Sequence, residues 1–275
     1  MIDSLASLLG QYEGSIRLAI AGGLFCVLAI TEIFRPRRKL TLSKSQRWTT
    51  NLAIIVLDSV LVRLLFPAAA VGVALWAQSA GYGLFNLVEF PLWLSILISF
   101  IVLDFAVWFS HVLSHKVPIF WRIHRMHHAD RDIDVTTGIR FHPFEIVISM
   151  IWKVGWVLLL GAPAVAVIVF EIVLNGTAMF NHSNMKLPKR VDRLLRLVVV
   201  TPDMHRVHHS AKGNETDSNY GFNLPWWDRL FGTYIDQPEL GHEGMTIGLS
   251  RWQDNRPAQF VWSLSVPFLS NNNRK

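Results

Sequence analysis

Five long apolar runs dominate the pattern of hydrophobic and polar positions along the chain, at residues 18–34, 52–77, 90–109, 146–160 and 164–180. A helix needs about 20 apolar residues to cross a bilayer, so the first three runs predict membrane-spanning helices. The turn signal Gly161-Ala162-Pro163 separates the last two runs, so we expect these two to form a helical hairpin. Because they are shorter, the sequence leaves open whether the hairpin crosses the membrane fully.

The composition agrees with a membrane protein. Of the 275 residues, 51% are hydrophobic and 17% are charged, and the mean hydropathy is +0.33. This composition excludes a disordered chain, and the single cysteine, Cys26, excludes a disulfide scaffold. Five such runs are too many for the buried core of a soluble protein of this length. We therefore predict an all-α, integral membrane helical bundle.

The placement of charge predicts the orientation of this bundle. Residues 35–50 carry six basic side chains and no acidic one, whereas residues 1–14 carry two acidic side chains and no basic one. The positive-inside rule then places the N-terminus outside and residues 35–50 in the cytoplasm. Alternation puts residues 110–145 and 181–275 in the cytoplasm as well. Topology and anionic lipid headgroups explain the net charge of +6, so we expect no nucleic-acid partner.

Eight of the eleven histidines form three clusters on the predicted cytoplasmic side, which we expect to fold as a helical cap. One cluster has the spacing H-x3-H and two have the spacing H-x2-HH. Residues three and four apart share a helix face, so the imidazoles of each cluster can reach one ion. Eight imidazoles suffice for two ions, and a histidine after the fifth run is a ninth candidate. The candidate metal ligands are His111, His115, His124, His127, His128, His182, His205, His208 and His209.

Three polar residues near these histidines are candidates for orienting the ligand imidazoles through hydrogen bonds. Asp104 lies on the same helical stripe as the H-x3-H pair, Asn175 lies on the corresponding stripe before His182, and Asp203 lies just before the last cluster. Purely structural roles stay open for all three: a solvated helix-end acid, a contact within the bundle, and a cap or loop brace.

Other residues near the clusters are expected to have structural roles. His142 can be a ligand or can fix the loop before the fourth run, and we favour the loop. We expect His242 at the surface, and we expect Asp228 to brace a loop. Trp226 and Trp227 are candidates for the aromatic belt at the membrane interface.

Ligand type limits the choice of metal. Neutral imidazole suits Zn, Cu, Fe and Ni, and without a cysteine cluster the chain cannot hold an iron–sulfur cluster. Many nitrogen ligands with open positions suit two non-haem irons that activate dioxygen. Two zinc ions are the main competitor, and the residues alone separate the two metals poorly.

The spaced motifs resemble those of the fatty acid hydroxylase superfamily, which includes the sterol desaturases. The segments that carry the resemblance are His124-Arg-Met-His-His-Ala-Asp130, Thr201-Pro-Asp-Met-His-Arg-Val-His-His209 and Trp227-Asp-Arg-Leu-Phe-Gly-Thr-Tyr234. The resemblance covers about residues 95–236. It implies N-terminal membrane helices at 1–94, a catalytic domain at 95–236 and a C-terminal tail at 237–275.

Members of this superfamily are membrane-embedded dinuclear metal oxygenases. The resemblance implies that the eight clustered histidines bind the metals. Some relatives have a further H-x3-H before the last cluster, and here that position reads Ala178-x3-His182. The resemblance also implies a lipid substrate (fatty acyl, sterol-like or ether lipid), O2, and a separate electron donor such as a ferredoxin or a b-type cytochrome with its reductase. The reaction is hydroxylation, desaturation or ether cleavage.

Two alternative functions stay open at this point. A zinc-dependent membrane hydrolase would need a general base near the ligands, for which Glu145 and Glu171 are the candidates. A metal transporter or sensor would place its ligands along a path near the midplane, whereas these histidines gather on one side.

Overall fold

The computed structural model describes residues 2–270 of the chain, with side chains described from residue 14 onward. Within this range the chain is helical and forms no strand, only two isolated β-bridges. Five helical segments there are long and apolar enough to cross a membrane: Gly14–Phe34, Lys44–Leu87, Leu92–Lys116, Pro143–Leu160 and Ala164–His182. The prediction of an all-α bundle with about five membrane helices is confirmed. The side of the membrane that each end faces stays a prediction.

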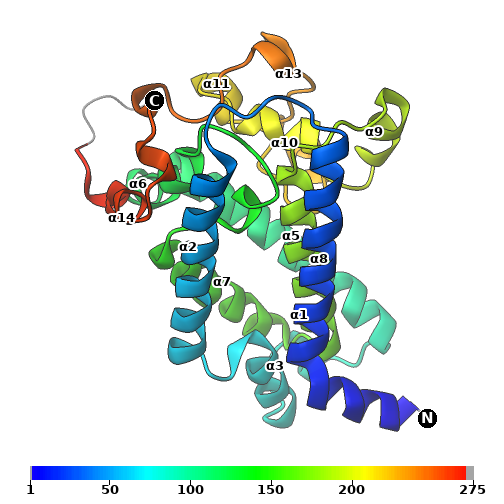
Figure 1. Cartoon of the computed structure of the whole chain (residues 1–275). Helices are drawn as coiled ribbons and strands as arrows, with labels where there is room; N and C mark the ends of the chain where they lie inside the picture. Colours follow the sequence, from blue (N-terminus) through cyan, green and yellow to red (C-terminus); the bar gives the residue numbers. More distant parts are fainter. Residues whose placement is uncertain (1, 271–275) are drawn as a thin grey trace.

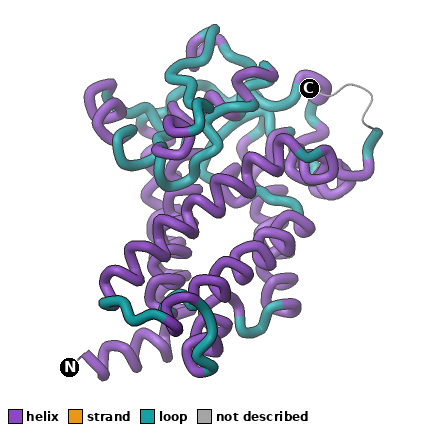
Figure 2. The backbone as a smooth tube through the Cα atoms, turned by 180° about the vertical axis from the view of Figure 1, so that it is seen from behind, coloured by secondary structure: helices purple, strands orange, loops and turns teal. Residues whose placement is uncertain are grey.

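The long helices run side by side, and short helices gather in a cap at one end of them (Figure 1). The view from behind shows the same division (Figure 2). The first residues of α1 lie at the end opposite the cap. The membrane elements are α1 (Ile2–Phe34), α2 (Lys44–Leu65), α3 (Ala69–Ser79), α4 (Leu84–Leu87), α5 (Leu92–Lys116), α7 (Pro143–Leu160) and α8 (Ala164–His182).

The second apolar run is two helices rather than one. Helix α2 ends at Leu65, and α3 begins at Ala69. Proline lacks a backbone N–H and disfavours the helical conformation of the residue before it. Phe66 accordingly has a non-helical backbone, with φ −129° and ψ 65°, and the helix is interrupted at Pro67.

The predicted hairpin is present as α7 and α8. Gly161 ends α7 in the left-handed conformation, with φ +63°. A Cβ at this position would lie 2.7 Å from the carbonyl oxygen of Tyr82, so the turn requires glycine for space as well as for backbone angle. The 18 residues of α7 extend about 27 Å, slightly less than the hydrocarbon core of a typical bilayer.

The membrane helices share one apolar core. It lies between α3, α5, α7 and α8 and includes the fully buried side chains of Ala70, Leu103, Val157 and Phe170. Small residues on α3 allow close packing against α7 and α8. This core packs the middle of α5 against the first half of α8.

The cap consists of short helices joined by loops. Its α-helices are α6 (Pro118–His128), α9 (Lys189–Leu195), α10 (Pro202–His208), α11 (Gly213–Thr216), α12 (Trp226–Leu230), α13 (Gly241–Gly244) and α14 (Phe260–Ser265). Its 3₁₀ helices are η1 (Thr137–Ile139), η2 (Ser250–Trp252), η3 (Arg256–Ala258) and η4 (Val266–Phe268). Residues 266–269 are bound to the cap, because Arg125 on α6 donates to the carbonyl oxygens of Val266 and Leu269, both at 2.7 Å.

A buried ionic network ties α2 to the loop after α6. The Arg47 guanidinium makes two 2.7 Å contacts with the Asp130 carboxylate and also pairs with Asp134. All three side chains are at most 2% exposed. Burial by itself would raise the pKa of Asp130, but the adjacent Arg47 outweighs it and holds that pKa below its ordinary value.

Candidate metal centre

Nine histidines meet where the membrane helices enter the cap. Helix α5 supplies two from its last turns, α6 supplies three, and α8 supplies one at its end. Two more lie on α10 and one directly after it. All nine are buried: His111, His115, His124, His127, His128, His182, His205, His208 and His209.

Their ring nitrogens form two groups, and within each group the nitrogens lie within 4.8 Å of one another. The first group has five members: His111, His115, His124, His128 and His208. The second group has four members: His127, His182, His205 and His209. The structure thus brings together every histidine that the sequence proposed as a ligand, including the ninth.

Each H-x2-HH cluster is divided between the two groups. On α6, His124 and His128 belong to the first group, whereas His127 belongs to the second. In the last cluster the assignment is reversed: His208 belongs to the first group, and His205 and His209 belong to the second. At 3.6 residues per turn, adjacent residues point about 100° apart, so His127 and His128 diverge to either side. The sequence predicted that each cluster reaches one ion; in the structure each H-x2-HH cluster instead contributes to both nitrogen groups.

Hydrogen bonds fix which nitrogen faces inward in four of these rings. In the first group, the Nδ1 atoms of His111 and His208 lie 2.7 and 2.6 Å from backbone carbonyl oxygens. In the second group, the Nδ1 atoms of His127 and His182 lie 2.9 and 2.7 Å from such oxygens. A carbonyl oxygen only accepts, so Nδ1 carries the proton in these four rings, and the lone pair of each ring lies on Nε2, the atom that can bind an ion.

Some inward-facing Nε2 atoms lie within hydrogen-bond distance of one another, although neither atom of the pair carries a proton. The Nε2 atoms of His127 and His182 are 3.1 Å apart, and those of His111 and His124 are also 3.1 Å apart. His111, His127 and His182 donate through Nδ1 to carbonyl oxygens, and His124 donates through Nδ1 to the Glu145 carboxylate. Neither contact can therefore be a hydrogen bond between neutral imidazoles. Facing lone pairs in a buried site repel each other unless a cation lies between them. Both nitrogen groups therefore fit metal ions.

The charge state of the histidines agrees with ligation. Burial, together with the neighbouring imidazoles, lowers the pKa of His127, His128, His205 and His209 well below its ordinary value. These rings are neutral at pH 7, which is the form that binds metals. Metal–imidazole bonds are about 2 Å long, so ligands of one ion lie up to about 4 Å apart. The observed spread of 4.8 Å needs only a small inward shift.

Glu145 is a positioning residue that the sequence did not assign to this role. Its Oε1 lies 2.6 Å from Nδ1 of His124. A carboxylate that holds a ligand imidazole in this way fixes its tautomer and increases its basicity. The sequence placed Glu145 at the start of α7 but gave no sign that it meets α6.

Replacing Glu145 is expected to weaken the first metal site. Glu145→Gln keeps an acceptor for His124 and should lower metal affinity about 10-fold, and Glu145→Ala should lower it about 100-fold. Competition with a chelator, followed by metal analysis of the purified protein, measures both values. Glu89→Gln, at an exposed position, is the matched control. Equal metal retention in all three variants would contradict the assignment.

The polar residues proposed to orient imidazoles have other partners. Asp104 is buried, but it accepts a 2.7 Å hydrogen bond from Nε1 of Trp227 rather than from an imidazole. Asp203 pairs with Arg37 and Arg206. Asn175 is exposed on α8, away from the buried rings, so its predicted role does not hold. On a bare sequence, a shared helical stripe could not show which neighbouring element supplies the partner.

Two further histidines lie outside both nitrogen groups. His142 caps α7, where its Nδ1 accepts a 3.1 Å hydrogen bond from the backbone N–H of Phe144, in line with the favoured loop role. His242 was expected at the surface, and this was wrong: it is 3% exposed and lies 3.6 Å from Asp203. Burial lowers the pKa of His242 to about 4, so this ring is neutral at pH 7.

Asp228 braces the loop that holds one of the metal-site histidines. Its carboxylate accepts hydrogen bonds from the backbone N–H groups of Tyr220 and Gly221, at 2.9 and 2.8 Å. The carbonyl oxygen of Tyr220 is the partner of Nδ1 of His111. The brace expected from the sequence is present, and it acts on His111 through the backbone.

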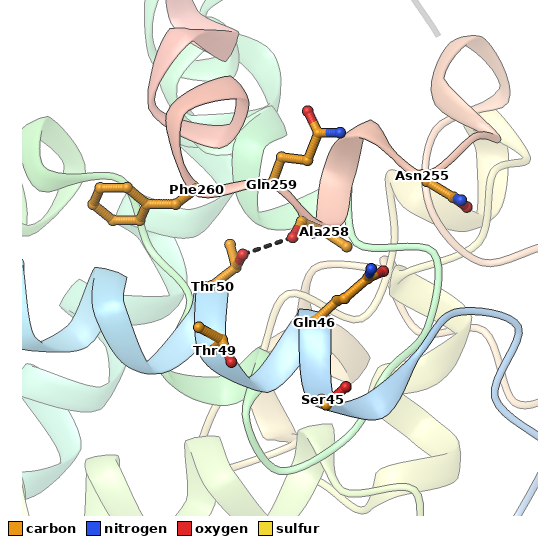
Figure 3. A pocket seen from close by; sticks show the side chains of 8 residues that line it. All are labelled: Ser45, Gln46, Thr49, Thr50, Asn255, Ala258, Gln259 and Phe260. Carbon is orange, nitrogen blue, oxygen red and sulfur yellow. Dashed lines mark hydrogen bonds between the residues drawn. The ribbon is translucent and has the colours of Figure 1, made fainter.

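A polar pocket of about 450 Å³ lies elsewhere, between the start of α2 and the segment around η3 (Figure 3). Hydroxyl and amide side chains line it, and Thr50 donates to the carbonyl oxygen of Ala258. The pocket contains no histidine and no charged side chain. It therefore offers no imidazole or carboxylate ligand for a metal.

Comparison with known proteins assigns the chain to a family. It is 30% identical over 150 residues to ornithine lipid hydroxylase OlsE of Rhizobium tropici, covering 54% of this chain and 44% of the relative. It is 31% identical over 159 residues to alkylglycerol monooxygenase of Xenopus tropicalis, covering 57% and 34%. It is 27% identical over 205 residues to fatty acid hydroxylase vlmA of Lecanicillium sp, covering 65% and 50%.

The chain thus spans half or less of the length of these relatives. No solved structure matches it significantly. The model of the family described as Fatty acid hydroxylase matches residues 96–233, which contain all nine histidines of the two nitrogen groups. The resemblance seen in the sequence is confirmed: the chain belongs to the fatty acid hydroxylase family.

Proposed function

We propose that this protein is an O2-dependent lipid hydroxylase with two non-haem irons. The observation that carries the proposal is the pair of buried nitrogen groups with inward-facing Nε2 lone pairs, placed where the membrane helices meet the cap. Relatives named as hydroxylases and monooxygenases of lipids support the reaction class. Iron is favoured over zinc because hydroxylation is a redox reaction and zinc has no redox chemistry.

The five histidines of the first group would hold one iron, and the four of the second group would hold the other. When bound, the irons supply the activation of dioxygen. The second group has one nitrogen fewer because Ala178 stands one turn before His182, and the Ala178 carbonyl oxygen is the acceptor for its Nδ1. Four nitrogens leave more room for a non-protein ligand than five do.

The chain itself orients the ligands and excludes water. Glu145 and the backbone carbonyl oxygens hold the imidazoles in one tautomer, and complete burial keeps the two groups dry. An apolar groove of about 520 Å³ runs along α7 and offers space for a hydrocarbon chain. Its lining includes Phe120, one turn before His124, and Ile148, one turn after Glu145. A chain in this groove approaches the first group from the membrane side.

The proposed reaction requires partners. One oxygen atom enters a C–H bond of the lipid, and the other leaves as water with two protons and two electrons. The imidazoles are not oxidised in this reaction, so both electrons come from a donor outside the site, and the donor we propose is an electron-transfer protein such as a ferredoxin or a b-type cytochrome with its reductase. The substrate class is a lipid whose polar head lies at the membrane surface near the cap.

The alternative of a zinc hydrolase is disfavoured by the two candidate bases. Glu145 is engaged with Nδ1 of His124. Glu171 pairs with Arg17 and Lys153 inside the bundle. Each carboxylate therefore already has a partner through at least one of its oxygens. A transporter is disfavoured because both groups lie at the cap ends of α5 and α8 rather than along a path through the membrane.

The test is metal reconstitution combined with lipid analysis. We expect the detergent-purified protein to bind about two irons per chain under anaerobic conditions. Given air and a chemical or protein reductant, it should add one oxygen atom, traceable with ¹⁸O2, to a membrane lipid. Zinc-loaded protein is the control and should give no product. Full turnover with zinc, or without oxygen, would refute the proposal.

A further inference from the structure

Large apolar side chains are exposed on one side of the cap, around α9 and α12. The α9–α12 patch comprises Val191, Leu194, Leu197, Val198, Trp226, Leu230 and Phe231, which are 43% to 71% exposed. Two hydrogen bonds join its halves: Nε1 of Trp226 donates to the Leu197 carbonyl oxygen at 2.7 Å, and Arg229 donates to that of Arg196. A contiguous surface of this kind needs a partner.

The patch continues onto the membrane-spanning part of α5. The Phe231 ring stacks on Trp108 with centroids 4.7 Å apart, and the Trp227 ring meets Phe105 at 5.1 Å. Nε1 of Trp227 also reaches Asp104. Helix α12 therefore lies against α5 two to three turns before its end at Lys116.

The length of α5 sets the level of this contact. Its 25 residues extend about 37 Å, which exceeds a hydrocarbon core of about 30 Å. Counted from Leu92, about the last 7 Å of α5, roughly five residues that include His115, project beyond the hydrocarbon into the cap. The level of Trp108 is close to the boundary of the hydrocarbon, so α12 lies at the membrane interface. Tryptophan is enriched at that interface.

Positive charge accompanies the apolar surface. Lys186, Lys189, Arg190 and Arg193 are all exposed at or just before α9. Val191 and Leu194 share one face of this short helix, and Arg190 and Arg193 share the neighbouring face. The helix extends sideways beyond the upper ends of α1 and α8 (Figure 1). An apolar face beside a basic face is the pattern of segments that lie in a bilayer surface.

We propose that the α9–α12 patch is inserted into the leaflet on the cap side, with its four basic residues binding anionic lipid headgroups. A bilayer fits better than a protein partner, because the patch is continuous with α5 and carries the charge that anionic lipids attract. Insertion also bears on the metal centre. Asp228 of α12 holds the backbone at Tyr220, which positions His111.

The single cysteine makes the test direct. A Cys26→Ser background carries Leu230→Cys, labelled with the environment-sensitive dye NBD, in the full-length protein in nanodiscs containing phosphatidylglycerol. Leu240→Cys, with 68% exposure against 71% for Leu230, is the matched control on another part of the cap, and Leu97→Cys on α5 is the membrane reference. We expect spin-labelled lipids to quench the dye at 230 at least half as strongly as at 97, and to leave 240 unquenched.

Two outcomes would overturn the proposal. The first is equal, weak quenching at 230 and 240. The second is a dye at 230 that is blue-shifted but unquenched by spin-labelled lipids, which would mean that a second copy or another protein covers the patch.

The role of the positive charge is tested by changing Lys186, Lys189, Arg190 and Arg193 to glutamine. This variant should lose the preference for quenching by anionic over zwitterionic spin-labelled lipid, and an unchanged preference would refute headgroup binding.

Discussion

His127→Ala is expected to reduce bound metal from about two ions per chain to about one and to lower lipid hydroxylation by more than about 100-fold. His127 is one of four nitrogen donors in the second group, and its Nε2 faces that of His182 at 3.1 Å. Removing it leaves three donors and a buried gap. Metal analysis of the purified variant, together with product analysis by mass spectrometry, measures both effects.

The matched control for this variant is His242→Ala. His242 is buried, as His127 is, but it belongs to neither nitrogen group. We expect this variant to keep two metals and most of its activity. If His242→Ala loses as much metal as His127→Ala, the loss reflects general destabilisation of the cap, and the assignment of His127 as a ligand fails.

Arg47→Met is expected to lower the free energy of unfolding by about 3–5 kcal/mol, the usual cost of breaking a buried ion pair by removing one partner. The substitution leaves Asp130 and Asp134 buried without their shared cation. Thermal unfolding in detergent measures the loss. Arg63→Met, at an exposed position on the same helix, should have little effect.

The same network predicts sensitivity to acid. The pKa of Asp130 is lower in the folded protein than in the unfolded chain, so the unfolded state binds a proton first as the pH falls. Stability is therefore complete above the unfolded value of about 4 and decreases as the pH falls through the folded value. In Arg47→Met this decrease should begin at higher pH. An identical acid profile in both proteins would contradict the role of Arg47.

The membrane helices and the metal-binding side chains are the features of this protein that the local sequence pattern could predict. The apolar runs determine the membrane helices, because backbone groups in lipid must bond within a helix. Glycine at 161 determines the hairpin turn through its positive φ. The break at Pro67 follows from local backbone chemistry as well, although the sequence prediction counted this interrupted run as a single membrane helix. The H-x3-H and H-x2-HH spacings identified eight of the nine histidines because ligands on one helix follow its periodicity, and the ninth, His182, was identified by its place at the end of the fifth run.

Partners from distant parts of the chain were not predictable in this way. Helical stripes suggested Asp104 and Asn175 as orienting groups, yet the first meets Trp227, 123 residues away, and the second faces outward. Glu145, which does orient an imidazole, acts across the packing of α6 against α7. His242 was expected at the surface because its immediate neighbours are polar, but the fold buries it beside Asp203.

Three properties were readable from the residues alone: which segments enter the membrane, which side chains can ligate a metal, and the family. These properties depend on residue type and on spacing within one helix. The packing of the helices settled three others: adjacent histidines serve different nitrogen groups, Glu145 holds His124, and α12 lies against α5. The physical reason is that hydrogen bonds and coordination act over about 3 Å between elements far apart in the chain, and only packing brings those elements within that distance.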